Sequence, residues 1–333
     1  MLKVGIIGGG FGLYGLLPAF HATKNCQIVS ICGEKTERLL KYCKSIGLKK
    51  IYSDWRQMLN KENLDAVAIA VPPYIQYQIA KTAIDKGLHI FAEKPLALNV
   101  KEARALYIQA TKKKIIHTVD FIFPEIEAWK RVKKILDKKR YGALKHIMVN
   151  WDFLSYDIKH HRSSWKTDAS KGGGALSFYF SHVFYYLEYF TKSEISDLRS
   201  LMSYSKAGPG EAEVGLDLLF RCKNKITGYA HLRCDVPKIN RHQLIFVCDK
   251  TTIILETSNS ITENFTIRIY TEKGLKQLKL KKAAVKADVD ERVHEVKKIA
   301  QRFVNSCLKR IPMTPSFRDG LRVQELIHKV RPS

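Results

Sequence analysis

Lys94 is the residue that the sequence places best for chemistry, within the stretch Glu93-Lys94-Pro95. The stretch follows His89 to Ala92, a short apolar run that is typical of a buried parallel strand. In doubly wound sheets, functional groups gather at the carboxyl ends of the strands. A lysine at such an edge can polarise a substrate oxygen, and burial that lowers its pKa lets it exchange a proton. We predict Lys94 as a catalytic residue; the alternative is an ordinary surface ion pair.

A glycine-rich turn is expected at the same edge. Leu2 to Ile7 predicts a buried strand, and glycines at positions 8, 9, 10 and 12 precede an apolar segment with helical spacing. Glycines let the backbone approach a phosphate, and a helix N-terminus offers unpaired N–H groups. We therefore predict a dinucleotide site at Gly8, Gly10 and Gly12. In the preferred register Gly8 and Gly10 form the first pair, and Leu13 occupies the place of the third small residue; a literal match that begins at Gly10 starts too far beyond the strand.

The end of the second predicted strand bears on the choice of cofactor. In dinucleotide folds an acidic residue there usually bonds the ribose hydroxyls, whereas this chain has Gly33. Lys35 and Arg38 follow, and cations without the acid suit the 2′-phosphate of NADP. Glu34 can still reach the ribose, which would favour NAD. We predict NADP, with NAD as the alternative; in the structural alternative, the two cations are surface charges on a helix start capped by Thr36.

Composition favours a soluble globular protein of two domains. The 333 residues are 45% hydrophobic and 27% charged, and the formal net charge is +25. The basic residues are spread along the chain, and 124–139 has apolar residues on one helical face and charges opposite, so the excess predicts solvated helix faces rather than a nucleic-acid groove. We expect no nucleic-acid partner, and an anionic substrate such as a nucleotide-linked sugar is compatible with the charge.

The cysteines and histidines predict neither disulfides nor a metal site. The seven cysteines are scattered and form no C-x-x-C pair, which indicates the reduced thiols of a cytoplasmic protein. His160 and His161 are adjacent, so they would point to opposite faces of a strand, and no carboxylate or Cys cluster completes a shell. No window reaches the ~18 unbroken apolar residues of a membrane span, and the glycine density after Val4 argues against a signal peptide.

The order of elements predicts two kinds of sheet. Strands alternate with helices up to Val119, which specifies a Rossmann domain with a doubly wound parallel sheet (α/β) over residues 1–119. Val71-Pro72-Pro73 and Val119-Asp120 lie at the same strand-end edge as Lys94. Residues 120–333 form the second, α+β domain, with a strand at 144–153 and alternating runs that suit an antiparallel meander at 214–220, 226–232, 243–247, 252–255 and 265–270. Its last helices, at 285–308 and 318–330, are expected to return and pack on the first domain.

Several motifs together resemble the Gfo/Idh/MocA family, named for glucose–fructose oxidoreductase and inositol dehydrogenase. The similarity covers essentially the whole chain. It includes Gly8-Gly-Gly10-Phe11-Gly12, Leu17-Pro-Ala-Phe20, Val71-Pro-Pro73, Gly87 to Leu96 with Glu93-Lys94-Pro95, Gly172-Gly-Gly174-Ala-Leu with Ser181-His182, and Thr314 to Arg322.

The resemblance implies an NAD(P)-dependent oxidoreductase that acts on a sugar, nucleotide-sugar or cyclitol. It implies a second domain with an open, mainly antiparallel sheet that covers the nicotinamide and often forms a homo-oligomer interface. It places Lys94 near the nicotinamide and the reacting oxygen, and His182 near the substrate as a second catalytic residue. The predicted cofactor contacts are Gly8, Gly10, Phe11, Gly12, Gly33, Lys35, Arg38, Val71, Pro72, Gln76, Glu93 and Lys94, and the predicted substrate contacts are Trp165, Tyr179 and His182.

The chain departs from the family pattern around His182. An Asp is common four residues before this histidine, where the chain has Phe178. Phe180 replaces a glycine, Tyr185 replaces a second Asp, and Gln76 replaces a histidine of the first domain. Two rival functions follow from these departures and from the charge: a catalytically degenerate NADP(H)-binding regulatory or structural protein, and a nucleic-acid binder.

Overall fold

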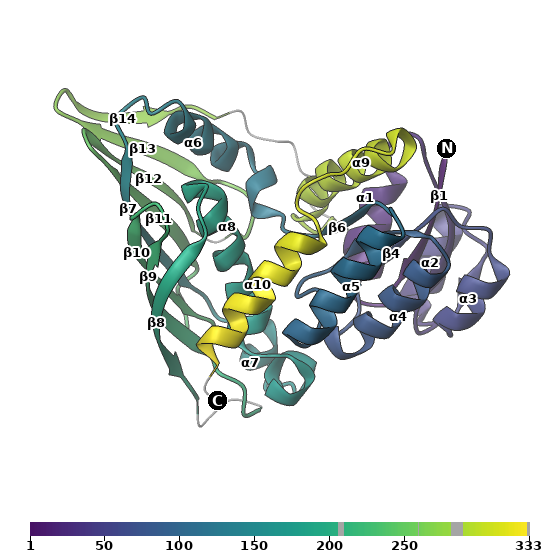
Figure 1. Cartoon of the computed structure of the whole chain (residues 1–333). Coiled ribbons are helices and arrows are strands. Elements are labelled where there is room, and N and C mark those ends of the chain that lie inside the picture. Colours follow the sequence, from purple (N-terminus) through teal and green to yellow (C-terminus); the bar gives the residue numbers. More distant parts are fainter. Residues whose placement is uncertain (206–209, 259, 281–288, 332–333) are drawn as a thin grey trace. The chain divides into compact units, whose positions relative to one another are not determined.

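A computed structural model of the chain describes residues 1–205, 210–258, 260–280 and 289–331. The chain divides into two compact units (Figure 1). The first unit comprises Met1–Ile122 and Val285–Glu325, and the second comprises Phe123–Ala284 and Leu326–Ser333.

The first unit is built on a parallel sheet. Its strands among the described residues are β1 (Leu2–Ile7), β2 (Cys26–Cys32), β3 (Ile51–Tyr52), β4 (Ala66–Ile69), β5 (His89–Ala92) and β6 (His117–Val119). Their order in the sheet is β3-β2-β1-β4-β5-β6, which is the dinucleotide-binding order. All strands are parallel, and the chain adds β2 and β3 on one side of β1 and β4 to β6 on the other. Because the central strands are apolar on both faces, they need helices on both sides.

Helices supply those covers. They are η1 (Gly12–Leu16), α1 (Leu17–His21), α2 (Glu37–Ser45), α3 (Trp55–Lys61), α4 (Pro73–Asp85), α5 (Val100–Lys112), α9 (Val293–Lys309) and α10 (Phe317–Val330), which ends in the second unit. α1 packs with α9, and α4 packs with α5. Phe20, Phe91 and Phe303 meet edge to face between α1, β5 and α9, with ring centroids 5.2–6.3 Å apart. This aromatic contact anchors α9 to the N-terminal part of the chain.

The second unit is built on a mainly antiparallel sheet. Its strands among the described residues are β7 (Leu144–Asp152), β8 (Ile195–Ser203), β9 (Gly215–Cys222), β10 (Thr227–Arg233), β11 (Arg241–Cys248), β12 (Thr251–Ser258), β13 (Thr266–Thr271) and β14 (Gly274–Leu278). The order is β14-β13-β12-β11-β7-β10-β9-β8, and β7 pairs with β10 in parallel. Burial alternates along β9 to β12, so one face is covered and the other is open.

Helices cover one face of this sheet (Figure 1). They are η2 (Phe123–Glu125), α6 (Glu127–Asp137), α7 (Tyr156–Lys159), η3 (Trp165–Thr167), η4 (Ala169–Lys171), η5 (Leu176–Phe180) and α8 (Ser181–Thr191). Trp129 of α6 stacks on Phe190 of α8, which in turn meets Phe246 of β11 edge to face. His242 lies flat on Trp151 inside the same core, with centroids 4.3 Å apart.

The predicted fold class is confirmed, with differences in detail. The meander is interrupted, because β7 lies between β10 and β11. β8 and β14 were not among the predicted runs. β4 ends at Ile69 rather than at Val71, although the N–H of Ala70 still donates to Ile7. α9 begins at Val293; positions 285–288 of the predicted helix lie outside the described residues. No helix among the described residues is long and apolar enough to cross a membrane.

Candidate active site

The glycine turn leaves an open concave backbone after β1. Gly8 has φ +136°, and a Cβ atom there would lie 2.1 Å from the carbonyl oxygen of Ala70, so only glycine fits. Gly9 and Gly10 are exposed, and a Cβ atom on Gly10 would meet no atom within 4 Å among the described residues. The backbone of the turn is therefore packed against Ala70 on the side of the sheet and open on the other side, as the approach of a phosphate requires.

The helix that follows approaches the strand at Gly12. η1 begins there, and a Cβ atom on Gly12 would lie 3.4 Å from the carbonyl oxygen of Ile7. Gly12 thus provides the close helix–strand approach for which the third small residue of the fingerprint is known. Leu13 is buried, and its N–H donates to Gly10 at 2.8 Å. Leu13 is therefore compatible with the turn, because the small residue lies one position earlier.

The second strand end explains the missing acid. A Cβ atom on Gly33 would lie 2.9 Å from the Cα atom of Gly9, so a side chain at position 33 would clash with the glycine turn. Lys35 and Arg38 are exposed, and the Thr36 side chain caps α2 by accepting from the N–H of Leu39 at 3.3 Å. Both cations are therefore available at the edge beside the glycine turn.

Arg292 adds a cation that the sequence pattern did not indicate. Its guanidinium lies 4.4 Å from the ring centroid of Phe11 and 5.9 Å from that of Tyr14. Asp290 accepts two hydrogen bonds from it at 2.8 Å, and this paired carboxylate raises the pKa of Arg292 despite the desolvation that opposes it. A paired positive charge thus lies against Phe11, a predicted cofactor contact.

Gln76 fixes the turn that carries Lys94. This residue of α4 is 1% exposed, and its Nε2 atom donates to the carbonyl oxygens of Glu93 (2.7 Å), Pro95 (3.0 Å) and Leu96 (3.1 Å). The N–H of Glu93 continues the sheet by donating to Ile69 at 2.9 Å. The visible contacts of Gln76 are therefore with the backbone of the turn, and the predicted contact with the cofactor stays a prediction.

Lys94 lies beside two carboxyl groups at the ends of β5 and β6. Ala92 of β5 pairs with Val119 of β6, which sets Glu93 next to Asp120. The Oε2 atom of Glu93 accepts from the backbone N–H of Lys94 at 3.1 Å. Asp120 is 1% exposed; burial and the neighbouring Glu93 raise its pKa well above the ordinary value, against the lowering effects of Lys94 and Arg292.

The first unit thus gathers most of the predicted cofactor residues at one edge. Ile7, Ile69, Ala92 and Val119 are in register across β1, β4, β5 and β6. The glycine turn, Val71-Pro72, Lys94 and Asp120 follow these four strand ends. Pro72 lies at the start of α4, and Val71 and Pro72 are both half-buried.

The predicted substrate residues belong to the second unit. His182 on α8 is 7% exposed and meets the ring of Phe123 edge to face, with centroids 5.0 Å apart. Tyr179 packs against Phe153 at 4.7 Å. Trp165 meets Phe178 at 5.4 Å, and the Nζ atom of Lys166 lies 4.9 Å from the Phe178 ring centroid. Phe178 is thus built into an aromatic cluster, and the roles of Trp165, Tyr179 and His182 toward a substrate stay predictions.

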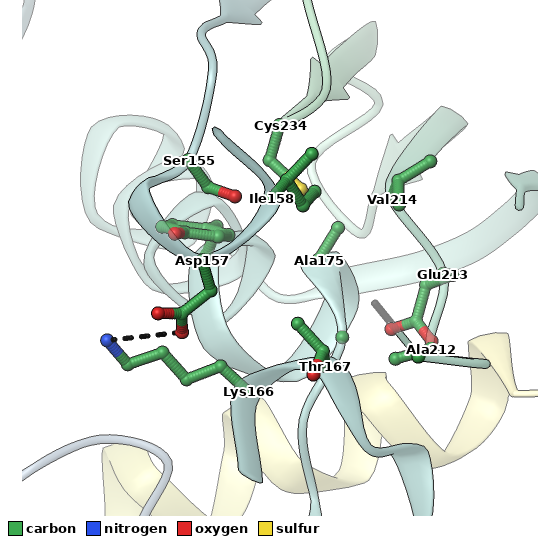
Figure 2. A pocket seen from close by; sticks show the side chains of 13 residues that line it. Ser155, Asp157, Ile158, Lys166, Thr167, Ala175, Ala212, Glu213, Val214 and Cys234 are labelled. Carbon is green, nitrogen blue, oxygen red and sulfur yellow. Dashed lines mark ion pairs between the residues drawn. The ribbon is translucent and has the colours of Figure 1, made fainter. Parts of the chain in front are cut away.

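A small cavity lies in the second unit (Figure 2), and Tyr179 is one of the residues that line it. It measures about 30 Å³, room for about two waters. Asp157 and Lys166 form an ion pair of 3.9 Å at its wall. Glu213 accepts from the N–H of Leu176 at 2.9 Å, and burial raises the pKa of this carboxyl. Sequence analysis did not indicate the cavity, because its walls come from distant segments. No group of three His, Cys, Asp or Glu that could hold a metal occurs in the described part of the chain.

Comparisons with known proteins agree with this geometry. An uncharacterized oxidoreductase of Synechocystis sp. is 27% identical over 98% of this chain and 92% of its own length. Levoglucosan dehydrogenase of Pseudarthrobacter phenanthrenivorans is 29% identical over 61% of this chain and 54% of its own.

Solved structures share the fold over nearly the whole chain. A levoglucosan dehydrogenase in complex with NADH and levoglucosan has a TM-score of 0.85 at 20% identity, covering 99% of this chain and 96% of that one. A 3-ketoreductase of Actinomadura kijaniata in complex with NADP and TDP-benzene has a TM-score of 0.82 at 18% identity, covering 99% and 97%.

Two family models match consecutive parts of the chain. The model described as an oxidoreductase family with an NAD-binding Rossmann fold matches residues 2–121, and the GFO/IDH/MocA C-terminal domain matches residues 129–254. Together they span most of the sequence, and they agree with the strand order of the first sheet and the open second sheet. The chain belongs to the GFO/IDH/MocA family of NAD(P)-dependent oxidoreductases.

Proposed function

We propose that the protein is an NADP-dependent dehydrogenase or reductase of a sugar or nucleotide-sugar. The observation that carries the proposal is the single edge of the first sheet at which the open turn of Gly9 and Gly10 and the ammonium-bearing Lys94 lie. A glycine turn alone would suit any nucleotide, whereas an acid–base group at the same edge adds a means to handle a carbinol or ketone oxygen.

The residues present fit a dinucleotide. Gly8 to Gly12 would hold the pyrophosphate, with Arg292 stacked on Phe11 as a cationic neighbour. Val71 and Pro72 would border the nicotinamide ribose. When bound, the cofactor would supply hydride exchange at C4 of the nicotinamide. The protein would hold the substrate carbon in place and manage one proton.

Lys94 and His182 are the residues to which we assign that proton. Lys94 would polarise the reacting oxygen and exchange the proton with it. His182 would hydrogen-bond the same or a neighbouring hydroxyl, and Trp165 and Tyr179 would contact the sugar ring. Phe178 occupies the position where an acid is common, so this chain has no Asp–His pair to share the proton transfer. Lys94 therefore carries more of the proton transfer here.

We propose NADP as the preferred cofactor. Gly33 removes the acid that would repel a 2′-phosphate, and Lys35 and Arg38 are exposed near it. NAD is the alternative, with Glu34 on the ribose. The similar solved structures contain either cofactor, NADH in one and NADP in the other.

The substrate class follows from the relatives and from the charge. A similar dehydrogenase is named for levoglucosan, and a similar reductase for a dTDP-linked deoxyhexose. The net charge of +25 suits the diphosphate of a nucleotide-sugar at least as well as a neutral sugar. We further propose a cytoplasmic homo-oligomer that associates through the open face of the second sheet.

The alternative function is an NADP(H)-binding protein that has lost catalysis. Phe178 favours it, because the acid that would pair with His182 is replaced by a ring held against Trp165. This protein would bind NADPH and turn over no sugar.

Fluorescence titration with NADPH and NADH is the first test, and a screen of keto-sugars and nucleotide-sugars for loss of NADPH absorbance is the second. We expect NADPH to bind at least tenfold more tightly than NADH, which corresponds to ~1.4 kcal/mol. Binding without turnover would favour the alternative function. Equal binding would remove the preference for NADP, and absence of binding would refute the proposal.

A further inference from the structure

Asp120 is an ionisable residue that is buried as deeply as the apolar core. It is 1% exposed, and neither side-chain oxygen receives a hydrogen bond from an N–H or O–H donor among the described residues. A carboxylate in that state would carry the full cost of desolvation. Its position is well defined, because its backbone N–H donates to the carbonyl oxygen of Ala92 at 2.9 Å. The side chain therefore needs another way to satisfy its oxygens.

Glu93 can provide a hydrogen-bond partner for Asp120 if one of the two carboxyl groups carries a proton. Strand pairing sets the two residues side by side at the ends of β5 and β6, and two carboxyl groups can hydrogen-bond each other only when one of them is a donor. Glu93 itself is fixed, since Gln76 holds its carbonyl and the N–H of Lys94 donates to its Oε2 atom. Like charges side by side do not both ionise readily, and Glu93 adds to the burial that raises the pKa of Asp120.

The charged groups around the pair are arranged to make that proton exchangeable. Lys94 follows Glu93 directly, and Arg292 interacts with both Glu93 and Asp120 from the segment before α9. Asp290 neutralises much of the Arg292 charge through its two hydrogen bonds. Burial and Glu93 raise the pKa of Asp120, and Lys94 and Arg292 oppose that rise.

We propose that Glu93 and Asp120 share one proton and form the proton reservoir of the Lys94 site. This inference rests on the proposed function and deepens it. Oxidation of a carbinol removes one hydride, which the cofactor accounts for, and one proton, which needs an acceptor. The ammonium of Lys94 gives a proton to the ionised pair, and the resulting amine takes the proton of the hydroxyl, so Lys94 ends the step charged again. In reduction of a ketone the pair returns the proton. The pair changes from two negative charges to one as the nicotinamide loses its positive charge, so the site keeps its net charge.

Asp120→Asn tests the reservoir without changing its charge. The protonated pair of the wild type carries one negative charge, and so does Glu93 beside an Asn, but the variant has no exchangeable proton. Infrared difference spectroscopy of the cofactor-free protein between pH 6 and 9 should show a carboxylic acid band that titrates in the wild type and is missing in Asp120→Asn. Glu93→Gln leaves Asp120 next to two cations, so the band should vanish or titrate at lower pH. Glu213→Gln identifies any band from the other buried carboxyl with a raised pKa.

Calorimetry links the pair to the cofactor. Titration with NADP⁺ and with NADPH in two buffers of different ionisation enthalpy gives the protons exchanged on binding. The positive ring of NADP⁺ favours the ionised pair, so we expect NADP⁺ to release up to one proton more than NADPH. The difference should disappear in Asp120→Asn and persist in Asp65→Asn, a matched change at an exposed position before β4, the opposite end of the strands.

The outcomes separate the reservoir from the proposed function. A missing carboxylic acid band in the wild type, or an unchanged proton difference in Asp120→Asn, would overturn the reservoir even if the enzyme turns over sugars. A titrating band that Asp120→Asn removes, in a protein that binds neither nucleotide, would support the shared proton and refute the proposed function and the coupling to it.

Discussion

At the scale of single residues, Lys94 carries the proposed chemistry, because it is the basic side chain in the strand-end turn between β5 and α5. Lys94→Ala removes the group that polarises the oxygen and exchanges its proton. We expect turnover to fall by at least ~10²-fold, as loss of general acid–base help usually does, with NADPH affinity within a few fold of the wild type. Steady-state rates on the sugar that passes the screen measure this. Lys86→Ala, at the exposed end of α4, is the control. Near-normal turnover in Lys94→Ala would refute the role.

For His182, normal activity at every pH in His182→Asn would exclude an essential proton relay.

Gly8 and Gly10 differ in what a methyl group would meet, which separates folding from binding. A Cβ atom at Gly8 would clash with Ala70 at 2.1 Å, so we expect Gly8→Ala to lower the melting temperature by several degrees or to prevent folding. Gly10→Ala has room and should melt like the wild type. Its methyl group would fill the phosphate cradle, and we expect NADPH affinity to fall at least tenfold. Differential scanning fluorimetry and fluorescence titration measure the two effects. Unchanged affinity in a well-folded Gly10→Ala would contradict a pyrophosphate at this turn.

At the scale of elements, α4 positions the Lys94 turn through one buried amide. Gln76→Leu removes a donor from three carbonyl oxygens, and we expect a loss of 1–3 kcal/mol of stability, as for other buried hydrogen bonds left unpaired. Turnover should fall with it, because the backbone on both sides of Lys94 loses its support. Gln78→Leu changes an exposed residue of the same helix and is the control. Urea unfolding gives the free energies. Equal stability of the two variants would show that Gln76 does not hold the turn.

The elements also show how far sequence reasoning reaches. The glycine turn, the capped start of α2 and the strand ends at Ala92 and Val119 were predictable, because each depends on a few consecutive residues. The place of β7 between β10 and β11 was not, since strand order depends on long-range pairing that no local pattern records. The bonds of Gln76 and the stacking of Arg292 on Phe11 join distant segments, so the side-chain type gave no signal. The roles of Trp165, Tyr179 and His182 remain predictions.

At the scale of the whole molecule, buried histidines in both units make stability depend on pH. His89 accepts the N–H of Ile116 in the first core, and His242 lies flat on Trp151 in the second. Burial is the main cause that lowers their pKa values, to about 4 for His89 and about 3 for His242. Because unfolding returns each to an ordinary value near 6.5, the unfolded chain binds more protons between pH 6.5 and 4, and stability falls as pH falls through this window.

The expected size of the effect is about 2 kcal/mol for each histidine between pH 8 and pH 5. Urea unfolding at the two pH values measures it. His89→Asn and His242→Phe should each reduce the pH-dependent loss by about that amount, whatever their stability at pH 8, and the double variant should reduce it by about twice as much because the residues lie in separate cores. A pH dependence that both variants leave unchanged would show that these imidazoles titrate normally.

The open face of the second sheet is where we expect copies of the chain to meet. Leu201 of β8 and Leu219 of β9 are 70% and 63% exposed, and both line a shallow hollow together with Tyr229 of β10. Leu219 and Tyr229 are paired across β9 and β10, so their side chains form one apolar area, which Arg199 and Asp217 border on the side of β8. Leu219→Lys would place a charge at the centre of the proposed interface, and we expect it to dissociate the oligomer. Sedimentation velocity at micromolar concentration measures this, and Leu275→Lys on β14, an equally exposed leucine at the far edge of the same sheet, should leave the oligomer intact. A wild type that sediments as a monomer would exclude association through this face. An oligomer that survives Leu219→Lys and dissociates in Leu275→Lys would exclude it too, because the introduced lysine would then disrupt association only at the far edge of the sheet.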